Sequence, residues 1–378
     1  MTDNIMNDIT RRGWLVGTTA IASSMMMARG ASAQTMINMG EPVSKDNPIR
    51  YTNNENPYGI NPKVMEAIIE AYKKAHLYNF TTRRKLVKII SEIEDIPPEC
   101  ILVGAGSTEF LMATGALCGI AGGNAVVPYP SYAAVTRYVT RFGGQVIEVP
   151  VREDMSINLD DLRQAMTDNT KLVYISNPNN PIPNIVEKKS LEKFCLEVSK
   201  KAMVVIDEAY YEYVRNDDFS TMAHLVKDNP NIIVLRTASK IHAFANVRVG
   251  FAFGHPDTVK LLAKFGSNTI SYPAQIGAMV SYKDKEYQKF VVDKNYQSLE
   301  ILYKMFDELN LPYVKSNANF TYFNAGRDAK IVRDKLLESG VLVGRQYKAF
   351  PNWVRISTAK PEEMDYLVKI YKRDFGNI

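Results

Sequence analysis

Short apolar runs and amphipathic segments alternate along the chain from about residue 100. The apolar runs are rich in β-branched residues and nearly continuous, which is typical of strands that are covered on both faces. Segments with helical spacing separate them, and this alternation predicts a mostly parallel sheet with right-handed crossovers. We expect strands at 101–103, 125–127, 146–151, 172–175, 203–206, 232–235 and 247–253, and helices at 109–118, 132–142, 158–166 and 190–200.

The pattern changes after about residue 280, where a long, charged segment at 285–309 has apolar residues at helical spacing. The fold class is therefore α/β, with a mostly parallel sheet in a large domain at 77–280 and a small α+β domain at 281–378. We expect the N-terminal arm at 34–76, with its own helix at 62–75, to join the small domain. The other elements expected in the small domain are strands at 319–324, 341–343 and 353–356 and helices at 330–338 and 362–375.

Residues 1–33 are expected to form a signal peptide rather than part of the fold. Arg11 and Arg12 precede an uncharged run of small and apolar residues from Trp14 to Ala28, and a segment typical of a cleavage site ends at Ala33. This pattern resembles a twin-arginine export signal and predicts a periplasmic or exported protein. The alternative is a disordered N-terminus with a chance arginine pair, on a cytoplasmic protein.

Composition excludes few classes of protein. The chain has 378 residues, of which 46% are hydrophobic and 23% charged, as in ordinary globular proteins. The net charge of +5 is not gathered in a basic run, so we predict no nucleic-acid partner. No apolar run reaches the ~20 residues that span a bilayer, which argues against stable membrane insertion. The three cysteines lack metal-ligand spacing and predict buried thiols and no metal.

Lys240, Asp207 and Arg248 form the most informative combination in the sequence. Lys240 follows a strand-like run, Asp207 ends an earlier one, and Arg248 lies eight residues beyond the lysine. Pyridoxal 5'-phosphate (PLP) requires an amine for its Schiff base, an acid for its pyridine nitrogen and a cation for its phosphate. The three residues therefore predict PLP as the cofactor.

Further polar and aromatic residues follow strand-like runs and could complete a PLP site. Gly106, Ser107 and Thr108 lie between a strand and a helix, where free backbone N–H groups favour a phosphate. Asn180 follows another strand, at the sheet edge where ligands of α/β proteins bind, and it would share the phenolic oxygen of the cofactor with Tyr210. Tyr132 is an aromatic platform for the ring, and Arg355 is a clamp for a substrate carboxylate.

These residues resemble, in order and spacing, those of fold-type I PLP enzymes of the class I/II aminotransferases, in the branch related to histidinol-phosphate aminotransferase. The resemblance covers about residues 48–376. It implies that Lys240 holds PLP as a Schiff base and then acts as the base at the substrate Cα, that Ser239 contacts the phosphate, and that Asn56 lies beside the substrate. It also implies a homodimer with shared active sites, in which Tyr78 contacts the phosphate of the neighbouring subunit.

The loops around the cofactor depart from the family pattern. Ile182-Pro183 stands where Thr-Gly is usual, and the residues after the lysine are Ala243-Phe-Ala-Asn246 in place of Gly-Leu-Ala-Gly. We expect Asn246 to replace the last glycine at positive φ. His242, two residues past Lys240, is either a packed neighbour or a second acid–base group beside the substrate.

The leading hypothesis is thus a PLP-dependent transaminase of an amino acid or a phosphorylated amine. The alternative is a PLP- and O2-dependent oxidase of an amino acid such as L-arginine on the same scaffold, suggested by the altered loops. A non-catalytic ligand-binding protein is a third reading, and the presence of Lys240 argues against it.

Overall fold

The computed structural model describes residues 43–267 and 269–376. The predicted signal peptide, residues 1–33, lies outside this range. Among the described residues, no helix is both long and apolar enough to span a bilayer.

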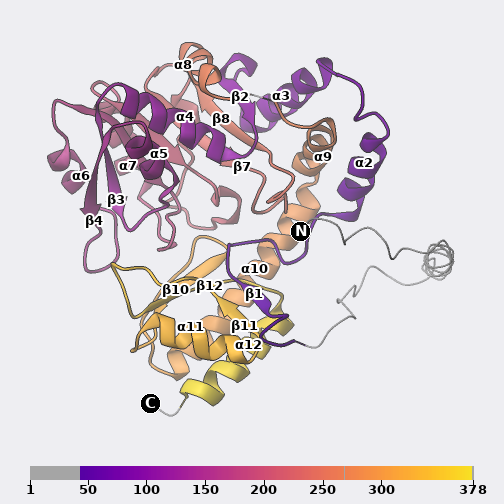
Figure 1. The fold of residues 1–378 in the computed structure, drawn as a ribbon, viewed down its shortest axis with the longest axis vertical. Coiled ribbons are helices and arrows are strands. Elements are labelled where there is room, and N and C mark those ends of the chain that lie inside the picture. The colour runs from indigo at the N-terminus through magenta and orange to yellow at the C-terminus, as the bar shows by residue number, and fades with distance from the viewer. Residues whose placement is uncertain (1–42, 268, 377–378) are drawn as a thin grey trace, which may run out of the picture. The chain divides into compact units, whose positions relative to one another are not determined.

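Seven strands form the central sheet of the large domain (Figure 1), in the order β2-β8-β7-β6-β5-β3-β4. Only β8 runs antiparallel to its neighbours, and every other pair is parallel. This confirms the predicted mostly parallel sheet. The strands are β2 (Ile101–Gly104), β3 (Asn124–Tyr129), β4 (Gln145–Pro150), β5 (Thr170–Ser176), β6 (Met203–Asp207), β7 (Ile232–Thr237) and β8 (Gly250–Gly254).

Both faces of this sheet are buried. Along β6, Val204 and Ile206 join one apolar core, whereas Val205 between them joins another. Because successive side chains of a strand point to opposite faces, the two cores lie on the two sides of the sheet. The helices of the large domain are α3 (Thr81–Glu94), α4 (Ser107–Ile120), α5 (Ala134–Arg141), α6 (Leu159–Ala165), α7 (Lys188–Val198), α8 (Pro256–Leu262) and α9 (Tyr272–Lys283).

The N-terminal arm is shared between the two domains. Strand β1 (Ile49–Tyr51) pairs with β11 (Val341–Val343) of the small domain, as its expected membership implies. Helix α2 (Pro62–Tyr72) instead packs against α9, and its Ile68 belongs to a core of the large domain. The two helices approach closely because Gly277 has no side chain, and a Cβ there would lie 2.6 Å from Ile68 Cγ1. The expectation that the whole arm joins the small domain is therefore wrong for α2.

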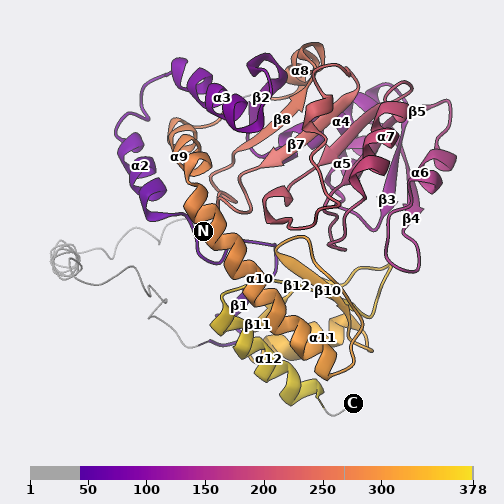
Figure 2. The same cartoon turned by 180° about the vertical axis from the view of Figure 1, so that it is seen from behind.

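The small domain has a separate core. A three-stranded antiparallel sheet of β9 (Tyr313–Val314), β10 (Phe320–Asn324) and β12 (Trp353–Ser357) and the helices α11 (Ala329–Glu338) and α12 (Pro361–Phe375) contribute to it. Helix α10 (Lys285–Glu308) runs from the large domain into it, as Figure 2 shows. Near the start of α10, Val291 forms an apolar cluster with Ile241 of the large domain. Near its end, Phe306 lies in the core of the small domain. One continuous helix therefore connects the two domains.

Candidate active site

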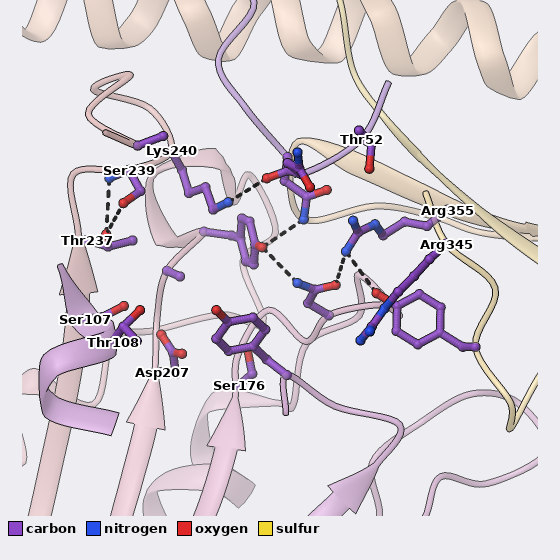
Figure 3. A pocket seen from close by; sticks show the side chains of 18 of the residues that line it. Thr52, Ser107, Thr108, Ser176, Asp207, Thr237, Ser239, Lys240, Arg345 and Arg355 are labelled. Carbon is purple, nitrogen blue, oxygen red and sulfur yellow. Dashed lines mark hydrogen bonds between the residues drawn. The ribbon is translucent and has the colours of Figure 1, made fainter. Parts of the chain in front are cut away.

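A cavity of about 660 Å³ lies between the two domains, with the N-terminal arm along one side (Figure 3). The carboxyl ends of adjacent strands β5, β6 and β7 reach it with Ser176, Asp207 and Thr237. Small-domain residues line the opposite side. The cavity brings together the following residues predicted from sequence: Ser107, Thr108, Tyr132, Asn180, Asp207, Tyr210, Ser239, Lys240, Arg248 and Arg355.

Lys240 lies in the loop that follows β7 and reaches across to the arm. Its Nζ donates a hydrogen bond to the backbone oxygen of Asn53 at 2.9 Å. Burial, and then the positive charge of Arg355, lower the pKa of the amine to about 8. An appreciable part of the amine is therefore neutral near pH 7.5, which a nucleophilic lysine requires.

Asp207, the last residue of β6, is 2% exposed. Its Oδ2 accepts a hydrogen bond from the Tyr174 hydroxyl at 3.1 Å, but its Oδ1 has no hydrogen-bond partner among the described residues. Burial raises the pKa of this carboxyl to about 6. A buried carboxylate with a free oxygen requires a cationic partner, and the protonated ring nitrogen of PLP fits this requirement.

The residues predicted to bind the phosphate gather at the start of α4. Arg248 Nη2 donates to the backbone oxygen of Ala105 at 2.9 Å, and Nη1 lies 3.4 Å from Ser239 Oγ. Gly106 adopts φ 82°, and a Cβ at this position would collide with the Arg248 guanidinium. The glycine therefore allows the arginine to approach the free N–H groups of the helix N-terminus, where a phosphate is favoured.

In the loop that carries both Lys240 and Arg248, the residues with positive φ are not the one that we expected from the sequence. Positive φ angles occur at Ala243 (60°) and Arg248 (65°), and not at Asn246 as expected. Left-handed backbone costs energy for residues with a Cβ, so packing must hold it. Phe244 is fully buried in this loop, and its N–H donates to Ala238 O at 2.9 Å.

Polar side chains link the two domains across the cavity. The Tyr210 hydroxyl accepts hydrogen bonds from Asn54 Nδ2 at 2.8 Å and Asn180 Nδ2 at 3.1 Å. Asn180 Oδ1 in turn accepts from Arg355 Nη1 at 2.6 Å, and the same nitrogen donates to the Tyr347 hydroxyl at 3.1 Å. Arg355 on β12 is thus connected to the large domain through Asn180 (Figure 3).

Two residues predicted to contact the substrate do not line the cavity. Asn56 is buried with both side-chain polar atoms engaged: Nδ2 donates to Ile241 O at 2.8 Å, and Oδ1 accepts from Tyr58 N at 3.0 Å. His242 is 2% exposed, its Nδ1 lies 2.8 Å from Ser281 Oγ, and its ring stacks on Tyr282. The geometry contradicts both predictions. Asn56 binds the backbone of the loop that carries Lys240, and His242 packs on Tyr282 instead of facing the cavity. Of the two readings of His242, the packed neighbour agrees with the structure.

Tyr78 is 94% exposed and does not line the cavity within one chain. This placement leaves its predicted contact with a neighbouring subunit as a prediction.

Several cavity residues were not predicted from sequence. Thr237 Oγ1 donates to Ser239 Oγ at 2.9 Å, and its position at the end of β7 was a usable signal. Tyr174 does not line the cavity but donates to Asp207; the sequence gave no signal for it, since only the pairing of β5 with β6 brings the two residues together. The small domain and the arm add Asn53, Arg333, Arg345 and Tyr347.

Comparisons with known proteins identify the family of this chain. The family described as aminotransferase class I and II matches residues 47–370. A histidinol-phosphate aminotransferase of Caldicellulosiruptor saccharolyticus is 30% identical over 343 residues, which are 88% of this chain and 95% of that protein. A second such enzyme, from Carboxydothermus hydrogenoformans, is 31% identical over 82% of this chain and 87% of its own.

Solved structures give the same result. A putative histidinol-phosphate aminotransferase from Erwinia carotovora atroseptica has a TM-score of 0.85 and 30% identity, over 89% of this chain and 98% of that one. The Sinorhizobium meliloti histidinol-phosphate aminotransferase, solved in complex with PLP, has a TM-score of 0.81 and 25% identity, over 90% and 97%. The chain therefore belongs to the class I and II aminotransferases and is a PLP-dependent transaminase.

Proposed function

We propose that this transaminase acts on an amine that carries a carboxylate or phosphate group, and passes the amino group to a 2-oxo acid. The charge of the cavity lining is the observation that carries the proposal. Among the residues that the structure describes, five cationic side chains line the cavity (Lys240, Arg248, Arg333, Arg345 and Arg355), whereas Asp207 is the single acidic residue in the lining.

Arg355 is the residue that we assign to the substrate anion. Its Nε is buried without a hydrogen-bond partner among the described residues, although Nη1 is held by Asn180 and Tyr347. A guanidinium fixed in this way is prepared to bind a carboxylate or phosphate. Arg345, which is exposed, and Arg333 add positive charge on the same side of the cavity.

The other residues of the cavity would bind the cofactor and move the substrate proton. Lys240 would hold PLP through Nζ and later move the proton at the substrate Cα. When bound, PLP withdraws electrons from that carbon and so makes its proton acidic. Asp207 would keep the ring nitrogen protonated, and Arg248, Ser239, Thr237 and the start of α4 would bind the phosphate. Tyr132 lines the cavity as a candidate platform for the ring.

A cationic side chain fits this cavity poorly. The side chain of L-arginine would face Arg333, Arg345 and Arg355, and Asp207 is the one carboxylate that the described residues contribute to the lining. The match to aminotransferases also supports transamination and gives no support to the oxidase alternative.

Matched donors test the proposal. Purified enzyme loaded with PLP would be given histidinol phosphate or histidinol with 2-oxoglutarate as acceptor, and glutamate, glutamine or arginine with pyruvate as acceptor. Each donor would also be tested without an acceptor, while dissolved oxygen is followed. We expect histidinol phosphate to have a higher kcat/KM than histidinol, and glutamate to have a higher kcat/KM than glutamine or arginine. Turnover should need the 2-oxo acid. Arg345→Gln should raise KM for the anionic donors by about tenfold, as expected for loss of one charged contact. Preference for arginine, or oxygen uptake without an acceptor, would overturn the proposal.

We further propose a homodimer with shared active sites. Apolar side chains of α2 are exposed at Met65, Ile69 and Tyr72, which share one side of the helix. The turn between α2 and α3 adds Leu77, Tyr78 and Phe80, which are 57%, 94% and 80% exposed and border a hollow of about 630 Å³. So many large exposed apolar side chains in one segment indicate a protein interface.

Export by a twin-arginine signal is proposed from the sequence alone. Replacing Arg11 and Arg12 with lysines should keep the full-length protein in the cytoplasm, as measured by cell fractionation. Unchanged localisation would contradict the proposal.

A further inference from the structure

The Tyr210 hydroxyl is held in an unusual way. Two amide nitrogens, Asn54 Nδ2 and Asn180 Nδ2, donate to its oxygen at 2.8 and 3.1 Å. A tyrosine oxygen has two lone pairs and one proton. Both lone pairs are therefore used, and the hydrogen bonds of the described residues give the proton no acceptor. The proton is left to point into the cavity.

The orientation of both amides follows from their other partners. Arg355 only donates, so the atom of Asn180 that it contacts at 2.6 Å must be the oxygen. Ser357 Oγ accepts from the Asn54 backbone N–H at 2.9 Å and donates its proton to Asn54 Oδ1 at 2.7 Å. Each asparagine consequently presents its NH2 group to Tyr210.

We propose that Asn54 is a positioning residue that acts through Tyr210: it occupies a lone pair of the phenol and thereby directs the phenol proton to the phenolic oxygen of bound PLP. This inference rests on the proposed function, because it requires PLP to bind at Lys240. Burial raises the pKa of Tyr210, so the phenol keeps its proton at neutral pH.

The backbone of the arm explains why asparagine suits this position. Asn53 and Asn54 both adopt left-handed backbone, with φ 62° and 54°, which asparagine tolerates better than most residues. This double turn directs the Asn53 carbonyl to Lys240 Nζ and the Asn54 amide to Tyr210. Since Asn54 is 1% exposed and bonded to Ser357 of β12, the small domain helps to fix it.

Other charged and titratable groups also face Tyr210, and a test must separate their effects from that of Asn54. They are Arg355, Asp207 and Tyr132, and the Lys240 ammonium, which lies 5.6 Å from the ring centroid. Of these groups, only Arg355 touches the hydrogen-bond chain, through Asn180.

Absorbance titration of the PLP-loaded enzyme provides the test, without turnover. Asn54→Asp has nearly the same shape but offers only acceptors, so the Tyr210 proton would turn to the new carboxylate. A hydrogen bond to an ionised oxygen lowers its pKa. Its loss should therefore raise the pH midpoint of the visible band by about one unit. Asn53→Asp is the matched control, because it adds the same charge one residue away without touching Tyr210, and its shift should be much smaller.

Two more variants make the outcome decisive. Asn54→Gly keeps the left-handed backbone free of strain and should also raise the midpoint. In a Tyr210→Phe background, Asn54→Gly, which adds no charge, should produce no further shift, since the effect passes through the phenol. Equal shifts for Asn53→Asp and Asn54→Asp, or a shift that persists without the phenol, would overturn the inference. A wild-type protein without a visible band would instead refute the proposed function.

Discussion

A single carboxylate illustrates how stability and cofactor binding oppose each other in this site. Asp207 is almost fully buried, and burial raises its pKa from 3.8 to about 6. A folded-state pKa above the unfolded value contributes stability that is complete below about pH 4 and is lost as pH rises through about 6. Without a cation beside it, the ionised carboxylate therefore destabilises the fold at neutral pH.

Asp207→Asn should accordingly stabilise the PLP-free protein at pH 7.5, by up to about 3 kcal/mol, since one pKa unit corresponds to about 1.4 kcal/mol. The difference from wild type should shrink towards pH 4. PLP affinity should fall by about 2–5 kcal/mol, because the buried charge pair is lost. Urea unfolding of the PLP-free proteins and equilibrium dialysis of PLP measure the two effects. A variant that is less stable than wild type at pH 7.5 would contradict the argument.

The reactivity of Lys240 should depend on pH in a defined way. Burial and Arg355 lower its pKa from 10.5 to about 8. Because only the neutral amine attacks an aldehyde, the rate of PLP binding to the PLP-free enzyme should rise with pH up to about 8 and then level off. Arg355→Gln removes a repulsive charge and should move this midpoint upward, whereas exposed Arg152→Gln should not. Stopped-flow absorbance measures the rate, and a wild-type midpoint near 10 would refute the prediction.

At the scale of elements, a buried ion pair joins the ends of β6 and β7 behind the site. Arg236, which is 2% exposed, donates to Glu208 Oε2 from Nε at 2.9 Å and lies 3.4 Å from Glu94 Oε2. Glu208 is fully buried, and its Oε1 accepts from Met222 N at 2.8 Å. These contacts hold the residue after Asp207 in place.

Arg236→Met should destabilise the protein by about 3–5 kcal/mol, because it leaves Glu208 buried without its cation. The double variant Arg236→Met, Glu208→Gln should recover part of that loss, since the unpaired charge is then removed. Urea unfolding of the PLP-free proteins gives the comparison. A single variant as stable as wild type would show that this pair does not hold the strand ends.

At the scale of the whole molecule, the exposed turn between α2 and α3 predicts association. Leu77→Asp should convert a dimer to a monomer and weaken PLP binding, because Tyr78 would no longer reach a neighbouring site. Tyr78→Phe should leave the dimer intact and weaken PLP binding by several-fold, as expected for loss of one hydrogen bond. Leu196→Asp, on α7, is the control with an exposed leucine elsewhere. Light scattering and PLP titration measure both properties, and a monomeric wild type would refute the prediction.

Local sequence was sufficient for the large sheet and for most of the residues that we propose hold the cofactor. Strands covered on both faces produce continuous apolar runs, and Asp207 was predicted from the point where one such run ends. Helix α9 was not predicted because its buried face is built from small and polar residues, among them Gly277 and Ser281, which form no apolar stripe.

The sequence by itself determined the α/β fold and the cofactor, and it predicted most of the residues that we propose hold the cofactor, because such residues lie at the ends of single elements. Tertiary structure alone decided which neighbours those residues have. It placed Asn54 and Ser357, 303 residues apart, on the same hydrogen-bond chain, and it turned Asn56 and His242 away from the cavity. These arrangements depend on contacts between distant segments, and local patterns of polarity carry no information about such contacts.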